Sequence, residues 1–366
     1  MIYLDNAATT LIKPPAVHHA VLQAMETMAS PGRGGHPPAM RAAETVYDCR
    51  EAAAKLFHVP EPEQVVFTMN ATHGLNLAIR SLVRPGDTVA VSGFEHNSVT
   101  RPLHALGAKI QIAGDRLFDP EGFLTQFDQA LNGAKAAVCT HVSNAFGYVL
   151  PIGRVAALCR ARNVPLVIDA SQSAGILDLD FEYLGAAFIA MPGHKALFGP
   201  QGTGILLCGE PGTPLLLGGS GSESIRQQMP DSLPDRLEAG THNVCGIAGL
   251  LAGIRYVTQK GTDEILRHEK TLLEQMKGEL TGSGYELFTG ADQAGVISLT
   301  KPEKNCEELA AELSEHGICV RAGLHCAPFA HRTAGTLDTG TVRFSFSPFV
   351  TPGEITAACE ILKHLS

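Results

Sequence analysis

Short apolar runs recur along the first two thirds of the chain, and segments with apolar residues at helical spacing separate them. Runs that are apolar on both faces predict strands at Val65–Thr68, Thr88–Ser92, Ala136–Thr140, Pro165–Asp169 and Ala187–Met191. Helical spacing predicts helices between them, as at Thr72–Leu82 and Arg154–Arg162. Such strands in alternation with helices indicate a parallel sheet covered on both sides, which is an α/β domain.

The pattern changes after about residue 256. Longer, charged helices are predicted at Thr262–Leu280 and Asn305–His316, and they alternate with short strands at Val296–Leu299, Ile318–Arg321 and Val342–Ser347. This part indicates a smaller α+β domain. We therefore expect a large domain over residues 15–256 and a small domain made of residues 257–366 together with residues 1–14.

Two stretches rich in glycine, serine and proline are predicted as long loops, Leu217–Thr241 and Ala322–Thr341. Loops of this length within compact domains are usually functional. No segment repeats itself or is low in complexity, which excludes solenoids and disordered tails. Two long loops beside one domain boundary indicate a cleft.

Composition narrows the classes of function. The 366 residues include 28 Lys and Arg against 37 Asp and Glu, a formal charge of −9, without a basic block. This balance disfavours nucleic acid or an anionic membrane as a partner. The longest apolar run, Val244–Ile254, is shorter than the ~18 to 20 residues of a membrane span. The first residues lack the features of a secretion signal, so we expect a cytoplasmic protein.

The nine cysteines contain no C-x-x-C pair, so we expect no metal site. Most of them lie in segments that are otherwise apolar, which indicates buried thiols in a reducing compartment. Because the number of cysteines is odd, one thiol could be a reactive group rather than a packing residue.

The segment most informative about chemistry is MPGHKALFGPQGTG at residues 191–204. Lys195 directly follows a predicted strand and lies among glycines in surroundings poor in charge. Desolvation favours the neutral amine of lysine, the nucleophilic form that makes a Schiff base. A glycine-rich turn with a solvated lysine explains this segment equally well.

Three other segments place polar residues where strands end. Asp169 ends a buried strand and could pair with the ring nitrogen of pyridoxal phosphate, or simply cap the next helix. Thr72 stands at a helix start that suits a phosphate, or is part of an ordinary helix cap. His96 could stack on a flat cofactor ring or be a surface residue.

Taken together, the segments resemble one family. The chain resembles the cysteine desulfurase and selenocysteine lyase family from Tyr3 to Phe346. The resemblance lies in the order and approximate spacing of eight motifs: YLDNAAT, FTMNATHGLNL, FEHNS, HVSNAFG, VIDASQSAG, GHKALFGPQGTG, EAGTHN and RAGLHCA. The resemblance implies a fold-type I, pyridoxal-phosphate-dependent transferase of the class V aminotransferase group, with a mainly parallel sheet of the seven-stranded type. It also implies a homodimer whose active sites lie at the subunit interface.

The resemblance implies a role for each matched residue. Lys195 would bind pyridoxal phosphate covalently, Asp169 would pair with its ring nitrogen, and Gln172 would contact its ring hydroxyl. The ring face would stack on His96, and the phosphate would contact Ala71, Thr72, His194 and, from the neighbouring chain, Thr241. The substrate carboxylate would contact Asn144, Arg321 and Arg343, and the planar guanidinium suits that task.

Cys326 matches the sulfur carrier of the family, in the motif R-x-G-x-H-C-A at the start of the second loop. Exposed thiols on loops are the reactive kind, and a protonated His325 could favour the thiolate. Any single cysteine is more often a small buried hydrophobe, but the position in this motif reverses that expectation. The spacing resembles the subgroup with a short, ordered cysteine loop.

The sequence departs from the family pattern at a few positions. Pro192 stands where the family usually has a serine whose hydroxyl binds the phosphate, so we expect that contact to be lost or to come from another residue. Asn97 and Ser98 also differ from the common form of their motif. These changes indicate an outlying subfamily.

The expected reaction converts L-cysteine to L-alanine, with the sulfur passing to Cys326 as a persulfide and then to an acceptor protein or small thiol. A selenocysteine lyase that acts on L-selenocysteine is an alternative. Another class V aminotransferase or β-lyase is a second alternative. A non-catalytic protein that kept the fold is a third.

Overall fold

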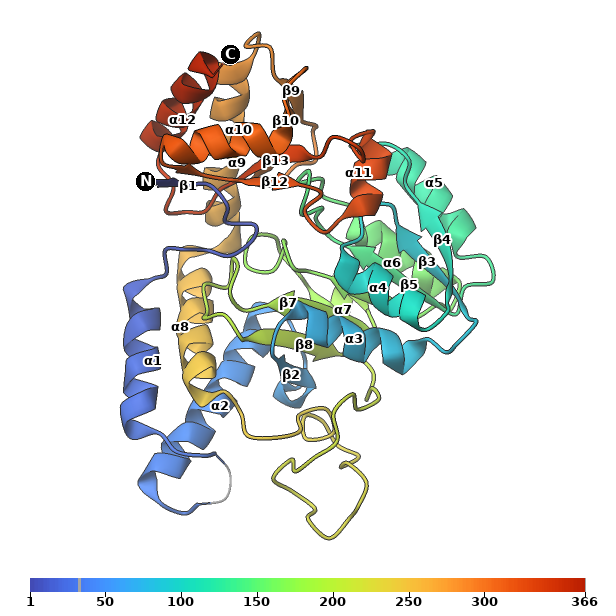
Figure 1. The fold of residues 1–366 in the computed structure, drawn as a ribbon. Coiled ribbons are helices and arrows are strands. Elements are labelled where there is room, and N and C mark those ends of the chain that lie inside the picture. Colours follow the sequence, from blue (N-terminus) through green and yellow to red (C-terminus); the bar gives the residue numbers. More distant parts are fainter. Residues whose placement is uncertain (32–33, 366) are drawn as a thin grey trace.

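A seven-stranded sheet lies at the centre of the computed structural model, which describes residues 1–31 and 34–365 (Figure 1). Its strand order is β2-β8-β7-β6-β5-β3-β4. β8 runs antiparallel to both of its neighbours, and the other neighbouring strands are parallel. The strands are β2 Val65–Thr68, β3 Thr88–Ser92, β4 Lys109–Ala113, β5 Ala136–Thr140, β6 Leu166–Asp169, β7 Phe188–Pro192 and β8 Gly204–Cys208. The predicted, mainly parallel α/β sheet is confirmed.

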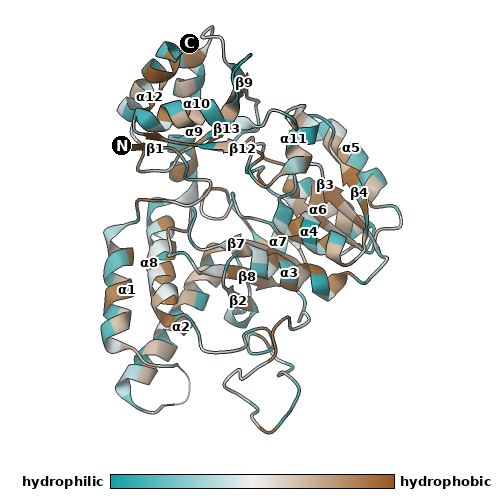
Figure 2. Cartoon of the chain, viewed as in Figure 1, coloured by the Kyte–Doolittle hydropathy of each residue, from teal (hydrophilic) through white to brown (hydrophobic). Residues whose placement is uncertain are grey.

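Successive residues of each strand face opposite layers of helices. In β5, Ala137 and Cys139 belong to one hydrophobic cluster and Ala136 and Val138 to another. The first cluster includes α2 Pro37–Leu56, α5 Pro120–Ala130, α6 Ile152–Ala161 and α8 Val244–Lys260, and the second includes α3 Ala71–Leu82 and α4 Asn97–Ala105. Burial on both faces explains why the inner strands are largely apolar (Figure 2).

A second, four-stranded antiparallel sheet has the order β12-β13-β10-β9 and its own hydrophobic cluster. Its strands are β9 Glu286–Phe288, β10 Val296–Thr300, β12 Arg321–Gly323 and β13 Thr341–Ser345. The cluster includes residues of α9 Thr262–Leu280, α10 Cys306–Glu315 and α12 Pro352–His364, together with Leu4. The division into domains at residues 14 and 256 stays a prediction, and α8 itself continues to Lys260.

The N-terminal segment links the two sheets. β1 Ile2–Tyr3 pairs in parallel with β11 Ile318–Cys319 in a separate two-stranded sheet, and the N–H of Ser345, the last residue of β13, donates to the carbonyl of Leu4 over 2.7 Å. Farther along, the N–H of Thr10 donates to the carbonyl of His194, beyond the end of β7, over 3.2 Å. This segment therefore contacts the ends of strands in both parts of the molecule.

Some elements differ from those predicted. β4 and β8 were not expected as strands, because β4 carries polar Lys109 and Gln111 and β8 follows a glycine-rich turn. The predicted strand Ile318–Arg321 divides into β11 and β12, which belong to different sheets. The predicted loop Ala322–Thr341 contains α11 Pro328–Ala334, which has proline in its first turn and a left-handed glycine, Gly335, at its end.

The remaining elements are α1 Pro15–Thr27, the 3₁₀ turn Pro62–Gln64 and α7 Phe181–Leu184. Between β8 and α8, residues 209–243 form no helix or strand, and they include the predicted loop Leu217–Thr241. None of the described helices is long and apolar enough to cross a membrane.

Candidate active site

A cavity lies beyond the carboxyl ends of the parallel strands, where the loops that follow β2, β3, β5, β6 and β7 meet. It is lined by Asn70, Ala71, Thr72, His96, Ser98, Thr140, Val142, Asn144, Asp169, Ser171, Gln172, Pro192, His194 and Lys195. The cavity brings together eight of the twelve predicted site residues. Strand ends of a parallel sheet converge in this way at ligand sites. No group of His, Cys, Asp and Glu among the described residues is arranged to bind a metal ion.

Lys195 lies in this cavity just beyond β7. Burial lowers the pKa of its amine from 10.5 to about 8. The nearby carboxylate of Asp169 opposes this shift, whereas the guanidinium groups of Arg343 and Arg321 reinforce it. A larger share of the amine is therefore neutral and nucleophilic near neutral pH than in an ordinary lysine.

Asp169 is the last residue of β6 and is almost fully buried. Its Oδ1 accepts a hydrogen bond from the backbone N–H of Ser171 over 2.9 Å and another from the Ser171 hydroxyl. Both contacts use the same oxygen, so among the described residues no hydrogen bond occupies Oδ2, which can serve a group inside the cavity. This is the carboxylate predicted to meet a cofactor ring nitrogen.

His96 caps the N-terminus of α4 as a neutral ring. Burial lowers the pKa of its imidazole to about 4. Its Nδ1 accepts the backbone N–H of Ser98 over 3.0 Å, which places the ring proton on Nε2. The Ser98 hydroxyl lies 2.9 Å from Nδ1 and 2.8 Å from the hydroxyl of Thr72. Ser98 therefore supplies a hydroxyl in the same cavity as Pro192, which has none.

The N-terminus of α3 opens into the cavity. The side chain of Asn70 accepts the N–H of His73 over 2.9 Å. The N–H groups of Ala71 and Thr72 have no intrahelical partner, as at the start of any helix, and such groups bind phosphate well. The sequence predicted these two residues as phosphate contacts.

The N-terminal segment contacts two residues that line the cavity, Gln172 and His194. Gln172 donates from Nε2 to the carbonyl of Ala7 over 3.0 Å, and the ring of His194 lies 3.0 Å from the hydroxyl of Thr9. The amine of Lys13 donates to the carbonyl of His194 over 2.8 Å, and burial lowers its pKa to about 8. The sequence pattern did not identify Lys13, because it lies beside a proline pair in an apparent loop.

Arg343 is 1% exposed, on β13. Its Nη2 lies 2.6 Å from the carboxylate of Asp5, and Nη1 donates to the carbonyl of Asn144 over 3.0 Å. The register of β12 and β13 places Arg321 directly opposite Arg343. Like charges in such a pair are unfavourable, so the two guanidinium groups suit an anion bound beside them.

Cys326 lies in the turn between β12 and α11, and of the nine cysteines, all in the described part of the chain, it alone is exposed. The Nη2 atom of Arg321 lies 3.9 Å from its sulfur. Both His325 and Cys326 adopt left-handed backbone angles, with φ of 50° and 58°. Such angles cost about 1 to 3 kcal/mol for each residue that is not glycine, so surrounding contacts must hold this turn.

The expectation that His325 favours the thiolate is wrong. Its ring is buried, and Nε2 lies 3.1 Å from the hydroxyl of Thr341, inside the small sheet. Burial strongly lowers the pKa of this imidazole, and the charge of Arg343 lowers it further, so the ring is neutral. The cation beside the thiol is Arg321.

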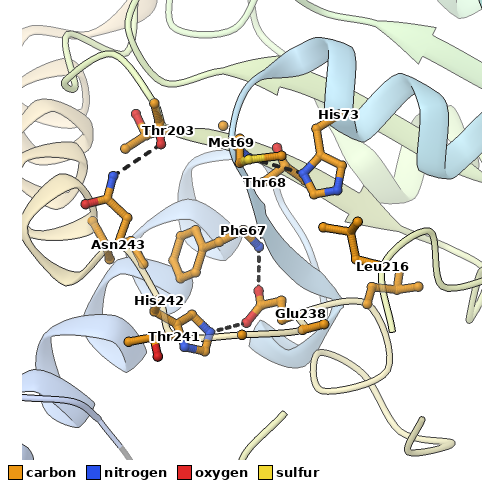
Figure 3. Close-up of a pocket in the computed structure, with 16 residues that line it drawn as sticks. Phe67, Thr68, Met69, His73, Thr203, Leu216, Glu238, Thr241, His242 and Asn243 are labelled. Atoms are coloured by element: carbon orange, nitrogen blue, oxygen red, sulfur yellow. Dashed lines mark hydrogen bonds and ion pairs between the residues drawn. The ribbon is translucent and has the colours of Figure 1, made fainter. Parts of the chain in front are cut away.

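Thr241 lies outside the cavity, in a second pocket lined also by Phe67, Met69 and Leu216 (Figure 3). The loop that carries it is anchored by the buried carboxylate of Glu238. This carboxylate accepts hydrogen bonds from Arg50 and from the N–H of Phe67, and it lies 2.5 Å from the ring of His242. The assignment of Thr241 to a neighbouring chain's site stays a prediction.

Glu95 has a fully buried carboxyl group beside the site. The sequence pattern did not indicate a role for this residue. Its Oε1 accepts the N–H of Thr140 over 2.7 Å and the hydroxyl of Ser92, while Oε2 has no partner among the described residues. Burial raises its pKa from 4.5 to about 8, although these hydrogen bonds oppose the shift. The carboxyl is therefore largely protonated at neutral pH.

Glu95 should make the folded state less stable as pH rises. Between pH 4.5 and about 8 the folded protein retains a proton that the unfolded chain releases, so the free energy of unfolding falls across this range. We expect Glu95→Gln to remove this loss. From pH 5 to pH 8, the free energy of unfolding of the variant should therefore rise by roughly 2 to 4 kcal/mol relative to that of the wild type. Urea denaturation at the two pH values measures it, and equal pH dependence in both proteins would contradict it.

The chain is similar over nearly its whole length to one family. The family model described as "Aminotransferase class-V" matches residues 2–357. A mainly parallel sheet with a half-buried lysine and a strand-end aspartate at its carboxyl edge fits that class. The chain belongs to the class-V aminotransferase family.

Within the family, several of the curated relatives and solved structures that match carry the name cysteine desulfurase. A "Probable cysteine desulfurase" of Pyrococcus abyssi is 31% identical, over 100% of this chain and 94% of its own length. Another, from Xylella fastidiosa, is 33% identical over 97% of this chain and 88% of its own. The apo structure of cysteine desulfurase from Thermococcus onnurineus NA1 matches with a TM-score of 0.91 and 30% identity, covering 100% of this chain and 94% of that one. The family and fold type inferred from the sequence motifs are confirmed.

Proposed function

We propose that this protein is a pyridoxal-phosphate-dependent cysteine desulfurase that converts L-cysteine to L-alanine. One observation carries the proposal: a cavity with a half-buried lysine, Lys195, and a strand-end carboxylate, Asp169, accompanies an exposed thiol, Cys326, beside Arg321. The similarity to proteins named cysteine desulfurases supports it.

The residues of the cavity fit the cofactor. Lys195 offers a neutral amine, Oδ2 of Asp169 is left for a ring nitrogen, and the N-terminus of α3 offers N–H groups to a phosphate. When bound, pyridoxal phosphate supplies an electron sink for the bonds at the substrate Cα. Further contacts would come from Gln172 to the ring hydroxyl, His96 to the ring face, Ala71, Thr72 and His194 to the phosphate, and Thr241 of the neighbouring chain.

The remaining residues would act on the substrate. Asn144, Arg321 and Arg343 would bind its carboxylate, and the Lys195 amine would take the proton from its Cα. The thiolate of Cys326 would then attack the substrate sulfur, so that a new S–S bond forms on the enzyme as the Cβ–S bond breaks. The electron pair of that bond stays on carbon, which after protonation becomes the methyl group of alanine, and an acceptor protein or small thiol then takes the sulfur.

The proposal extends to the assembly. We propose a cytoplasmic homodimer, in which Thr241 reaches the partner's cavity. The firmly anchored loop around Glu238 and the place of Thr241 outside its own chain's cavity support this arrangement. We further propose a large domain over residues 15–256 and a small domain of residues 1–14 and 257–366, which carries Cys326.

Incubation of the cofactor-loaded protein with L-cysteine tests the reaction. We expect alanine in solution and a mass increase of one sulfur atom on the peptide that contains Cys326, which a reducing thiol removes. The peptide that contains Cys319, a half-buried cysteine, is the internal control and should stay unmodified. Formation of alanine without sulfur on Cys326 would overturn the role of this thiol, and transfer of the amino group to a keto acid would overturn the reaction type.

A further inference from the structure

The turn that carries Cys326 needs contacts from outside itself. Two successive residues, His325 and Cys326, have left-handed backbone angles, which side chains other than glycine rarely adopt. Within the turn, the N–H of Ala327 donates to the carbonyl of Leu324 over 2.8 Å. One such bond does not specify both unusual angles. The partners of the backbone carbonyl groups of His325 and Cys326 therefore decide what holds the turn.

Both carbonyl groups are bound by residues that follow strands of the seven-stranded sheet: Asn144 lies in the turn after β5, and Asn97 is the first residue of α4. The side-chain amide of Asn144 donates from Nδ2 to the carbonyl of His325 over 2.7 Å. The backbone N–H of Asn97 donates to the carbonyl of Cys326, also over 2.7 Å. Asn144 lines the cavity, and Asn97 directly follows His96, another lining residue. The turn is thus held by the wall of the cavity.

Asn144 also contacts Arg343 through its backbone. Its carbonyl accepts Nη1 of Arg343 over 3.0 Å, while its side chain bonds to the thiol's turn. A primary amide has two N–H groups, and the bond to His325 uses one of them. The second N–H stays available for a carboxylate, so the proposed substrate contact and the bond to the turn are compatible.

We propose that Asn144 is a positioning residue for Cys326: its amide keeps the turn of His325 and Cys326 in the left-handed conformation that presents the sulfur beside Arg321. The inference rests on the proposed function only in naming Cys326 as the sulfur carrier. The contact between the Asn144 amide and the His325 carbonyl joins two parts of the protein, so a substrate-binding role alone does not explain it.

Hydrogen exchange in the cofactor-loaded protein, measured without added L-cysteine, tests this role. In Asn144→Ala we expect the amides of Asn97 and Ala327, which report on the turn, to exchange about 5- to 10-fold faster, since one hydrogen bond is lost. Amides in the middle of α9 should exchange as in the wild type. Asn305→Ala, which removes the side-chain cap of α10, is the matched control and should leave Asn97 and Ala327 unchanged.

Equal exchange at Asn97 and Ala327 in Asn144→Ala and the wild type would overturn the proposal, because a residue that only binds substrate has no effect before substrate arrives. If Asn144→Ala does not fold, Asn144→Asp keeps the shape but cannot donate to the His325 carbonyl, and the same acceleration is expected. Exchange is read without turnover, so its outcome is separate from the test of desulfuration.

Discussion

Replacing Cys326 with serine should reduce alanine formation from L-cysteine by at least about 10³-fold, because a hydroxyl is a far weaker nucleophile toward sulfur than a thiolate. Cys326 is exposed and makes no packing contribution to a hydrophobic cluster, so the fold and the cofactor content should be unchanged. Alanine release and the visible absorbance of the bound cofactor measure the two effects.

Cys319→Ser is the matched control for this substitution. Cys319 is the neighbouring cysteine in sequence, half-buried at the end of β11, and its replacement should leave the rate within about twofold. Full activity of Cys326→Ser on L-cysteine would exclude the persulfide route. Activity lost on L-cysteine but kept on L-selenocysteine would instead favour a selenocysteine lyase.

Lys195→Ala should abolish covalent attachment of pyridoxal phosphate and lower turnover by at least about 10³-fold, since the amine that attaches the cofactor and moves the Cα proton is gone. Borohydride reduction of the loaded wild type, followed by peptide mass analysis, should place the cofactor on the peptide that contains Lys195. In Lys195→Ala the same treatment should leave no cofactor on the protein.

Lys13 offers a demanding control, because burial lowers its pKa to about 8 as well. It lies outside the cavity lining and bonds to the carbonyl of His194. Lys13→Met should therefore lower stability but retain the covalent label on Lys195. Cofactor found on Lys13 in the wild type would contradict the assignment of Lys195.

The central sheet could be predicted because its strands are buried on both faces. The bounds of β2, β3 and β5 agree with the apolar runs, since no polar position interrupts them. β4 escaped prediction because it is an edge strand that alternates polar and apolar residues. α11 escaped because a short helix between Pro328 and Gly335 has the composition of a loop.

The site residues that could be predicted are those that directly follow a strand. Asp169 and Lys195 each follow a buried strand, and a parallel sheet brings such ends together. The contact between Asn144 and His325 joins residues 181 positions apart, and that between Arg50 and Glu238 spans 188. No local pattern encodes these pairs, and the burial that keeps His325 neutral depends on the same distant packing.

The N-terminal segment has a consequence for the order in which the molecule is assembled during synthesis. Asn6 bonds to the carbonyl of Ser345, 339 residues away, and β1 finds its partner strand only at Ile318–Cys319. Contacts so distant in sequence form late, because a long loop must close first. Residues 2–6 therefore reach their native place only after residues 318–345 are available, so these contacts form late in folding.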